Sequence, residues 1–179
     1  MSIAPRTVRL LFATLVMAGG ALVAQAGIKS ERVLAAIISR TPAPQLVAEG
    51  QQLKSAERAA ALLPAAQAFW GIGRSMEPLY ATNTAVIVQE IKYDDIKKGM
   101  TVVYLKSTGV RVAHSVVGET RGGFLVQGVN NDEEDAELVT AENFIGVVVQ
   151  AYASADTAFR TETAKRLVAK GNIRTGNRS

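Results

Sequence analysis

The second half of the chain alternates short runs of aliphatic and β-branched residues with turn residues. Such runs are typical of strands. We expect five of them, at residues 85–91, 101–106, 110–117, 123–128 and 144–152. The short STG and TRG connections favour hairpins, and no crossover-helix pattern separates the runs. The pattern therefore predicts a mainly β fold, a coiled antiparallel and barrel-like domain over residues 70–152, with helical segments before it.

The residues before this domain follow a helical period. Ser30 is suited to cap a short amphipathic helix over residues 30–39, whose apolar face carries Val33, Leu34, Ile37 and Ile38. Residues 45–69 are rich in alanine and predict one or two helical pieces, interrupted at Pro64. We therefore expect residues 27–69 to be a helical linker region.

The N-terminus has the features of an export signal. Two arginines precede an apolar run at 10–24, and Ala-Gln-Ala at 24–26 supplies the small residues of a cleavage site. The alternative is an uncleaved anchor, because the apolar stretch at 10–28 has roughly the length that spans a bilayer. Residues 1–26 are thus predicted to be a signal peptide or an N-terminal membrane anchor. Both interpretations place the rest of the chain on the periplasmic or extracellular side.

The amino-acid composition excludes several kinds of functional site. The 179 residues include no cysteine and one histidine, and the formal net charge is +4. A disulfide framework, a thiolate zinc site, a cysteine nucleophile and a multi-histidine metal site are excluded, and we expect no metal and no cofactor. This charge is mildly basic and far from the dense Lys/Arg surface of a nucleic-acid binder, so we expect no nucleic-acid partner. The basic tail at 153–179 either is simply solvated or adds weak attraction to an anionic membrane surface.

Two segments carry candidate chemistry. Ser75 lies in GIGRSMEP, residues 71–78, where glycines permit a tight turn that exposes the hydroxyl and leaves the serine N–H free to donate to an oxyanion. His114 alternates with Val112 and Val116 along a predicted strand, so its side chain is expected to be buried. A buried histidine is either a hydrogen-bonded core residue or the base that a serine nucleophile requires.

An acidic loop follows the strand at 123–128. Its sequence is GVNNDEED, residues 128–135, and the glycine and asparagines indicate a turn. One carboxylate from this loop could orient the imidazole and stabilise its protonated form. For Asp132, Glu133 and Glu134 we expect solvated side chains.

These segments together resemble type I signal peptidases. The family surrounds its nucleophilic serine with a box similar to GRSMEP, in which methionine follows the serine. The later boxes of the family are similar, in the same order, to GMTVVYL at 99–105, VAHSVV at 112–117, GVNNDEED at 128–135 and FIGVVV at 144–149. The resemblance covers residues 70–150. A histidine in the position of the base is the feature of the archaeal and endoplasmic-reticulum subtype.

The resemblance implies roles for three residues. Ser75 would be the nucleophile, with its backbone N–H in the oxyanion hole, His114 the general base, and Asp135 the acid that supports His114. It also implies a coiled, largely antiparallel β-domain. The implied activity is that of a serine endopeptidase that cleaves extended polypeptide segments after small residues by acyl transfer.

Some positions differ from the family's pattern. Residues 82–84 stand where the family has a Gly-Asp pair, and Met100 and Val129 each stand where it has an aspartate. Ser115 replaces an arginine that usually follows the base. The alternative interpretation is therefore a catalytically degenerate relative that binds extended peptides on a sheet edge or supports an envelope assembly. A self-cleaving relative of phage-type repressors fits less well, because those proteins require a lysine base and a DNA-binding domain.

Overall fold

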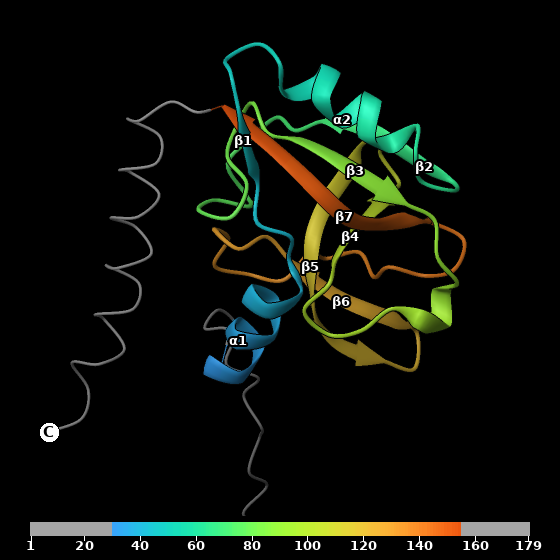
Figure 1. The fold of residues 1–179 in the computed structure, drawn as a ribbon. Helices are drawn as coiled ribbons and strands as arrows, with labels where there is room; N and C mark the ends of the chain where they lie inside the picture. The colour runs from blue at the N-terminus through green and yellow to red at the C-terminus, as the bar shows by residue number, and fades with distance from the viewer. Residues whose placement is uncertain (1–29, 155–179) are drawn as a thin grey trace, which may run out of the picture.

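The computed structural model describes residues 30–154, and a seven-stranded sheet forms its centre (Figure 1). The strands are β1 (Gln45–Val47), β2 (Ala66–Trp70), β3 (Ala85–Gln89), β4 (Thr101–Leu105), β5 (Arg111–Thr120), β6 (Gly123–Gln127) and β7 (Phe144–Ser154). The helices are α1 (Glu31–Arg40), α2 (Gln52–Ala60) and a single 3-10 turn, η1 (Tyr93–Asp95). The prediction of a mainly β fold with helices before it is confirmed.

The sheet is antiparallel apart from one short edge. Its strand order is β2-β3-β7-β4-β5-β6, with every neighbouring pair in this path antiparallel. The short strand β1 lies parallel to the end of β7. β7 is the longest strand and pairs with β3, β4 and β1, so it joins the two halves of the sheet. β2 and β6 are the open ends of the path.

All five predicted strands are present, but the prediction for residues 45–69 is partly wrong. Only α2 is helical there, and it ends at Ala60, before Pro64. The segment also contributes two strands, β1 and β2. β2 has the sequence AQAFW, in which alanine and glutamine are good helix formers by intrinsic propensity. Pairing with β3 from Ala66 to Trp70 outweighs that local preference.

Helix α1 is part of the core of the β-domain. The Ser30 hydroxyl accepts a hydrogen bond from the Val33 N–H at 3.3 Å, which confirms the predicted N-cap. Val33 and Ile37 are buried in a cluster with residues of β3, β4 and β7. Gly99 makes this packing possible, because a Cβ there would lie 2.5 Å from the Ala36 carbonyl. The predicted linker region thus supplies a helix that the sheet packs against.

Helix α2 covers the part of the sheet formed by β2, β3 and the end of β7 (Figure 1). Ala56 and Ala60 are buried against Ala85, Ile87 and Tyr152. Small alanines let the helix approach the strands closely, and this places β2 firmly beside β3. The end of β2 then leads directly into the turn that contains Ser75.

The predicted terminal segments lie outside the described residues. Residues 1–29 include the predicted signal or anchor, and residues 155–179 include the predicted basic tail apart from the last two residues of β7. Between residues 30 and 154, no helix combines the length and apolar character needed to cross a membrane.

Neighbouring isoleucines of α1 test the packing of this helix. Ile37 is fully buried, whereas Ile38 is 53% exposed. Replacing Ile37 with alanine is expected to lower the free energy of unfolding by about 2–5 kcal/mol, because it leaves a cavity in the core. Ile38→Ala is the matched control and should change it by less than about 0.5 kcal/mol. Urea unfolding measures both values, and equal effects would contradict the packing of α1 on the sheet.

Candidate active site

Ser75, His114 and Asp135 form one continuous chain of hydrogen bonds. The Ser75 Oγ lies 3.0 Å from His114 Nε2, and His114 Nδ1 lies 2.7 Å from Asp135 Oδ2. The three residues come from the turn after β2, from β5 and from the loop after β6. The fold therefore brings together all three residues that the resemblance singles out, although they are far apart in sequence.

Two buried side chains hold the turn that carries Ser75. Met76 and Tyr80 both lie in the core cluster that α1 joins, and the Tyr80 hydroxyl donates to the Pro42 carbonyl at 2.8 Å. Burial raises the pKa of Tyr80, so its hydroxyl stays protonated and remains a donor. Ser75 itself is only partly buried. Its neighbours are thus anchored in the core while its hydroxyl stays accessible.

The loop that carries Asp135 also holds the backbone of Ser75. The Asn130 N–H donates to the Ser75 carbonyl at 2.7 Å, and the Asp135 N–H donates to the Val126 carbonyl at 2.9 Å. Gly128 lies against the same serine, since a Cβ there would be 2.7 Å from the Ser75 carbonyl oxygen. One short segment therefore sets the positions of both the serine and the carboxylate.

His114 is buried, as the strand alternation predicts. Its side chain is 6% exposed, and its register partner on β4 is Val102. Val116 belongs to a buried cluster that also contains Val102, and Val112 packs against this cluster, on the side of β5 that His114 shares. The polar partners on its two ring nitrogens distinguish it from a histidine that only fills a core.

Asp135 has two further partners that the sequence analysis did not single out. The Tyr104 hydroxyl donates to Asp135 Oδ2, and Lys106 Nζ lies 3.8 Å from the same oxygen. Tyr104 lies in β4 and Lys106 directly follows that strand, each at a two-residue interval from Val102. This spacing places them on the same side of the chain as Val102, but only the pairing of β4 with β5 brings them to the histidine.

These partners keep Asp135 charged. Burial by itself raises the pKa of its carboxyl, but hydrogen bonds from His114 and Tyr104 and the charges of His114 and Lys106 outweigh burial and hold the pKa below its usual value. Burial, reinforced by the hydrogen bond to Asp135, raises the pKa of Tyr104, which stays a donor. A carboxylate that accepts from Nδ1–H leaves Nε2 free to accept the serine proton. The other acids of the loop, Asp132, Glu133 and Glu134, are exposed, as expected.

A cleft of about 340 Å³ opens beside Ser75 and His114. One wall is formed by residues 69–73, at the end of β2, and the other by residues 110–114, at the start of β5. Much of the wall surface is apolar, and the rim carries the exposed side chains Trp70, Ile72 and Val110. The cleft thus has mainly apolar walls and includes Ser75 in its lining.

Hydrogen-bonding groups in the cleft lack partners within residues 30–154. The start of β5 pairs with β4 along one edge only, because pairing with β6 begins at Ser115. No described residue accepts from the Ser75 N–H. An extended peptide would supply the missing partners, since its backbone carries a donor and an acceptor at nearly every residue.

The charge of Asp135 predicts a pH dependence of stability. Its folded-state pKa lies below its unfolded value of about 3.9, so the stabilisation is fully present above that pH and is lost as the pH falls through the folded-state pKa. Asp135→Asn removes this titration, and the free energy of unfolding should then fall less steeply below about pH 4. Unfolding at a series of pH values measures the slope. Asp132→Asn, at an exposed position of the same loop, is the control, and identical slopes for Asp135→Asn and the wild type would contradict the assignment.

Within residues 30–154 no three histidine, aspartate or glutamate side chains gather closely enough to hold a metal ion. Comparisons of the chain with family models, with curated proteins and with solved structures give no match. A function for this chain therefore has to be inferred from the geometry of the cleft and from its sequence motifs.

Proposed function

We propose that this chain is a serine endopeptidase of the type I signal peptidase kind, with Ser75 as nucleophile, His114 as general base and Asp135 as the supporting acid. The observation that carries the proposal is the unbroken hydrogen-bond chain from Ser75 through His114 to Asp135 at the edge of a cleft. Each member has the partner that its role requires. The proposal includes the coiled, barrel-like form of the sheet that is expected of that family.

The first half of the reaction forms an acyl-enzyme. His114 Nε2 takes the proton of the Ser75 hydroxyl as the Oγ attacks the peptide carbonyl, and Asp135 stabilises the resulting imidazolium through Nδ1–H. The Ser75 N–H, which has no acceptor among the described residues, is available to the developing oxyanion. The imidazolium then gives its proton to the leaving amine, and the C–N bond breaks.

The second half regenerates the serine. His114 removes a proton from a water molecule, the hydroxide attacks the ester carbonyl, and the Ser75 oxygen leaves with the proton that His114 returns. The products are a carboxylic acid and a free serine. No step requires a metal or a cofactor.

The substrate of the proposal is an extended polypeptide segment with small residues before the cut. The unpaired edge at the start of β5 supports extended binding, because a strand edge offers its N–H and C=O groups to a single added chain. The export signal predicted at residues 1–26 supports action on the periplasmic or extracellular side, either as a soluble protein or as an anchored one.

Cleavage of a precursor with an Ala-x-Ala site tests the proposal. The wild type should cleave it, whereas Ser75→Ala and His114→Ala should each lose activity by roughly a thousandfold or more. Gel analysis and mass spectrometry of the products measure rate and position. Ser107→Ala, at a hydroxyl bound to Glu137 and not to the triad, is the control and should retain activity. Binding without turnover, equal in the wild type and in Ser75→Ala, would contradict the proposal and favour the degenerate peptide-binding alternative.

The pH profile distinguishes His114 from a lysine base. A histidine base must be neutral, so the rate should rise across the range in which histidines titrate, about pH 5–8, and then level off. A rate that keeps rising to about pH 9–10 would indicate a lysine base instead, such as Lys106 or Lys92. Lys106 lines the cleft and Lys92 does not, so Lys106→Met should still give a rate that levels off at high pH if His114 is the base, whereas loss of the rise to about pH 9–10 would indicate that Lys106 is the base.

A further inference from the structure

The cleft carries positive charge that its own lining does not neutralise. Lys106 and Arg111 line it, and none of the lining residues is an aspartate or a glutamate. Lys106 is paired with Asp135, at 3.8 Å. Arg111 has no carboxylate within 4.0 Å among residues 30–154. The guanidinium of Arg111 is therefore the cation of the cleft that is left to interact with a ligand.

A neighbouring aromatic ring orients this guanidinium. Arg111 Cζ lies 5.6 Å from the centre of the Phe69 ring, and the two residues belong to opposite walls, β5 and β2. An arginine above an aromatic ring uses its flat face for that contact. Its N–H donors lie in the plane of the guanidinium and stay available for a carboxylate, which they can bind in two parallel hydrogen bonds.

The position of Arg111 along β5 sets the distance to the reacting bond. Arg111 precedes His114 by three residues on the same strand, which corresponds to about 10 Å along an extended chain. A peptide that lies along the unpaired edge of β5 advances by the same rise per residue. The substrate side chain beside Arg111 therefore belongs to a residue about three positions from the scissile bond.

We infer that the cleft selects extended peptides that carry an aspartate or glutamate about three residues from the cut, and that Arg111 binds this carboxylate. The cleavage preference rests on the proposed peptidase function, but the binding preference does not. Small residues at the cut would then be one part of the recognition, and a single acidic side chain the other. An amide of the same shape accepts only one of the two hydrogen bonds and carries no charge, so asparagine should substitute poorly for aspartate.

A set of peptides tests this preference in the wild-type chain. Each peptide has small residues before the cut at every position except the one under test, where a single aspartate is placed, moved one position at a time from four residues before the cut to four residues after it. Matched peptides carry asparagine or lysine in its place. We expect kcat/KM to be at least about tenfold higher for aspartate than for asparagine at one position near the third, and lowest for lysine there. Equal values for all three residues at every position would overturn the inference.

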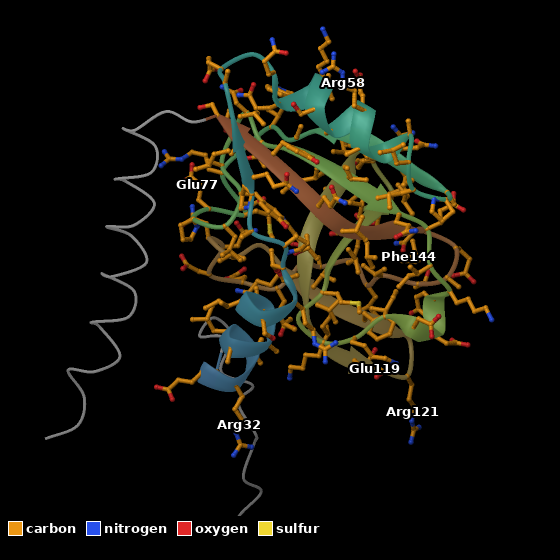
Figure 2. All side chains as sticks on the ribbon, viewed as in Figure 1. Arg32, Arg58, Glu77, Glu119, Arg121 and Phe144 are labelled. Atoms are coloured by element: carbon orange, nitrogen blue, oxygen red, sulfur yellow. The ribbon has the colours of Figure 1, made fainter. Side chains whose placement is uncertain are left out.

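Variants assign the preference to Arg111. Arg111→Gln should abolish the aspartate preference, and Arg111→Lys should keep part of it, because it retains the charge but not the planar pair of donors. Arg121→Gln is the matched control. Arg121 is exposed and lies far from Glu77, which belongs to the turn with Ser75 (Figure 2). An aspartate preference that persists unchanged in Arg111→Gln would overturn the role of this residue.

A binding measurement separates this inference from the proposed function. Trp70 is the single tryptophan of the chain and lines the cleft, so its fluorescence reports peptide binding without cleavage. In Ser75→Ala, the aspartate peptide should bind about tenfold more tightly than the asparagine peptide, and Arg111→Gln in the same background should remove the difference. This result together with no cleavage by the wild type would overturn the peptidase and leave the inference standing. Cleavage by the wild type without any preference for an acidic residue would overturn the inference and leave the peptidase function standing.

Discussion

One oxygen atom, Oδ2 of Asp135, is the point at which the polar parts of the structure meet. It accepts from His114 and Tyr104 and lies near Lys106, so it links β4, β5 and the loop after β6. A buried carboxylate without such partners would take up a proton or force the loop outwards. Because three partners compensate its burial, the carboxylate stays charged, and the register of β4 against β5 is tied to the position of the imidazole.

The apolar core places the serine against this polar centre. Met76 and Tyr80 anchor the turn on one side of Ser75, and the hydrogen bond from Asn130 holds its carbonyl on the other. Neither interaction involves the hydroxyl. The backbone is thus fixed by packing and by main-chain hydrogen bonds, while the side chain keeps the freedom to move between His114 and a substrate.

Much of this arrangement can be predicted from local sequence, and the rest depends on strand pairing. The five strands with β-branched residues are evident. The single histidine together with the turn around Ser75 is enough to suggest a nucleophile and its base. Asp135 could be selected only through a resemblance, because nothing local distinguishes it from the exposed acids beside it. Tyr104 becomes a partner only when β4 pairs with β5. The contact of Arg111 with Phe69 could not be foreseen, because β2 has no strand signal of its own and forms through β3 and α2.

The unpaired edge at the start of β5 favours an extended conformation in a peptide that binds in the cleft. An open strand edge on a flat surface can pair with the edge of another folded sheet, which is a route to aggregation. Here residues 69–73 form a wall opposite that edge, and the space between the walls is about 340 Å³. A single extended chain would need less room between these walls than a strand that is already part of a sheet, because that strand brings its neighbours with it. Under the proposed function, the cleft would therefore discriminate by the folding state of its substrate, and folded proteins would be protected by their own hydrogen-bonded structure.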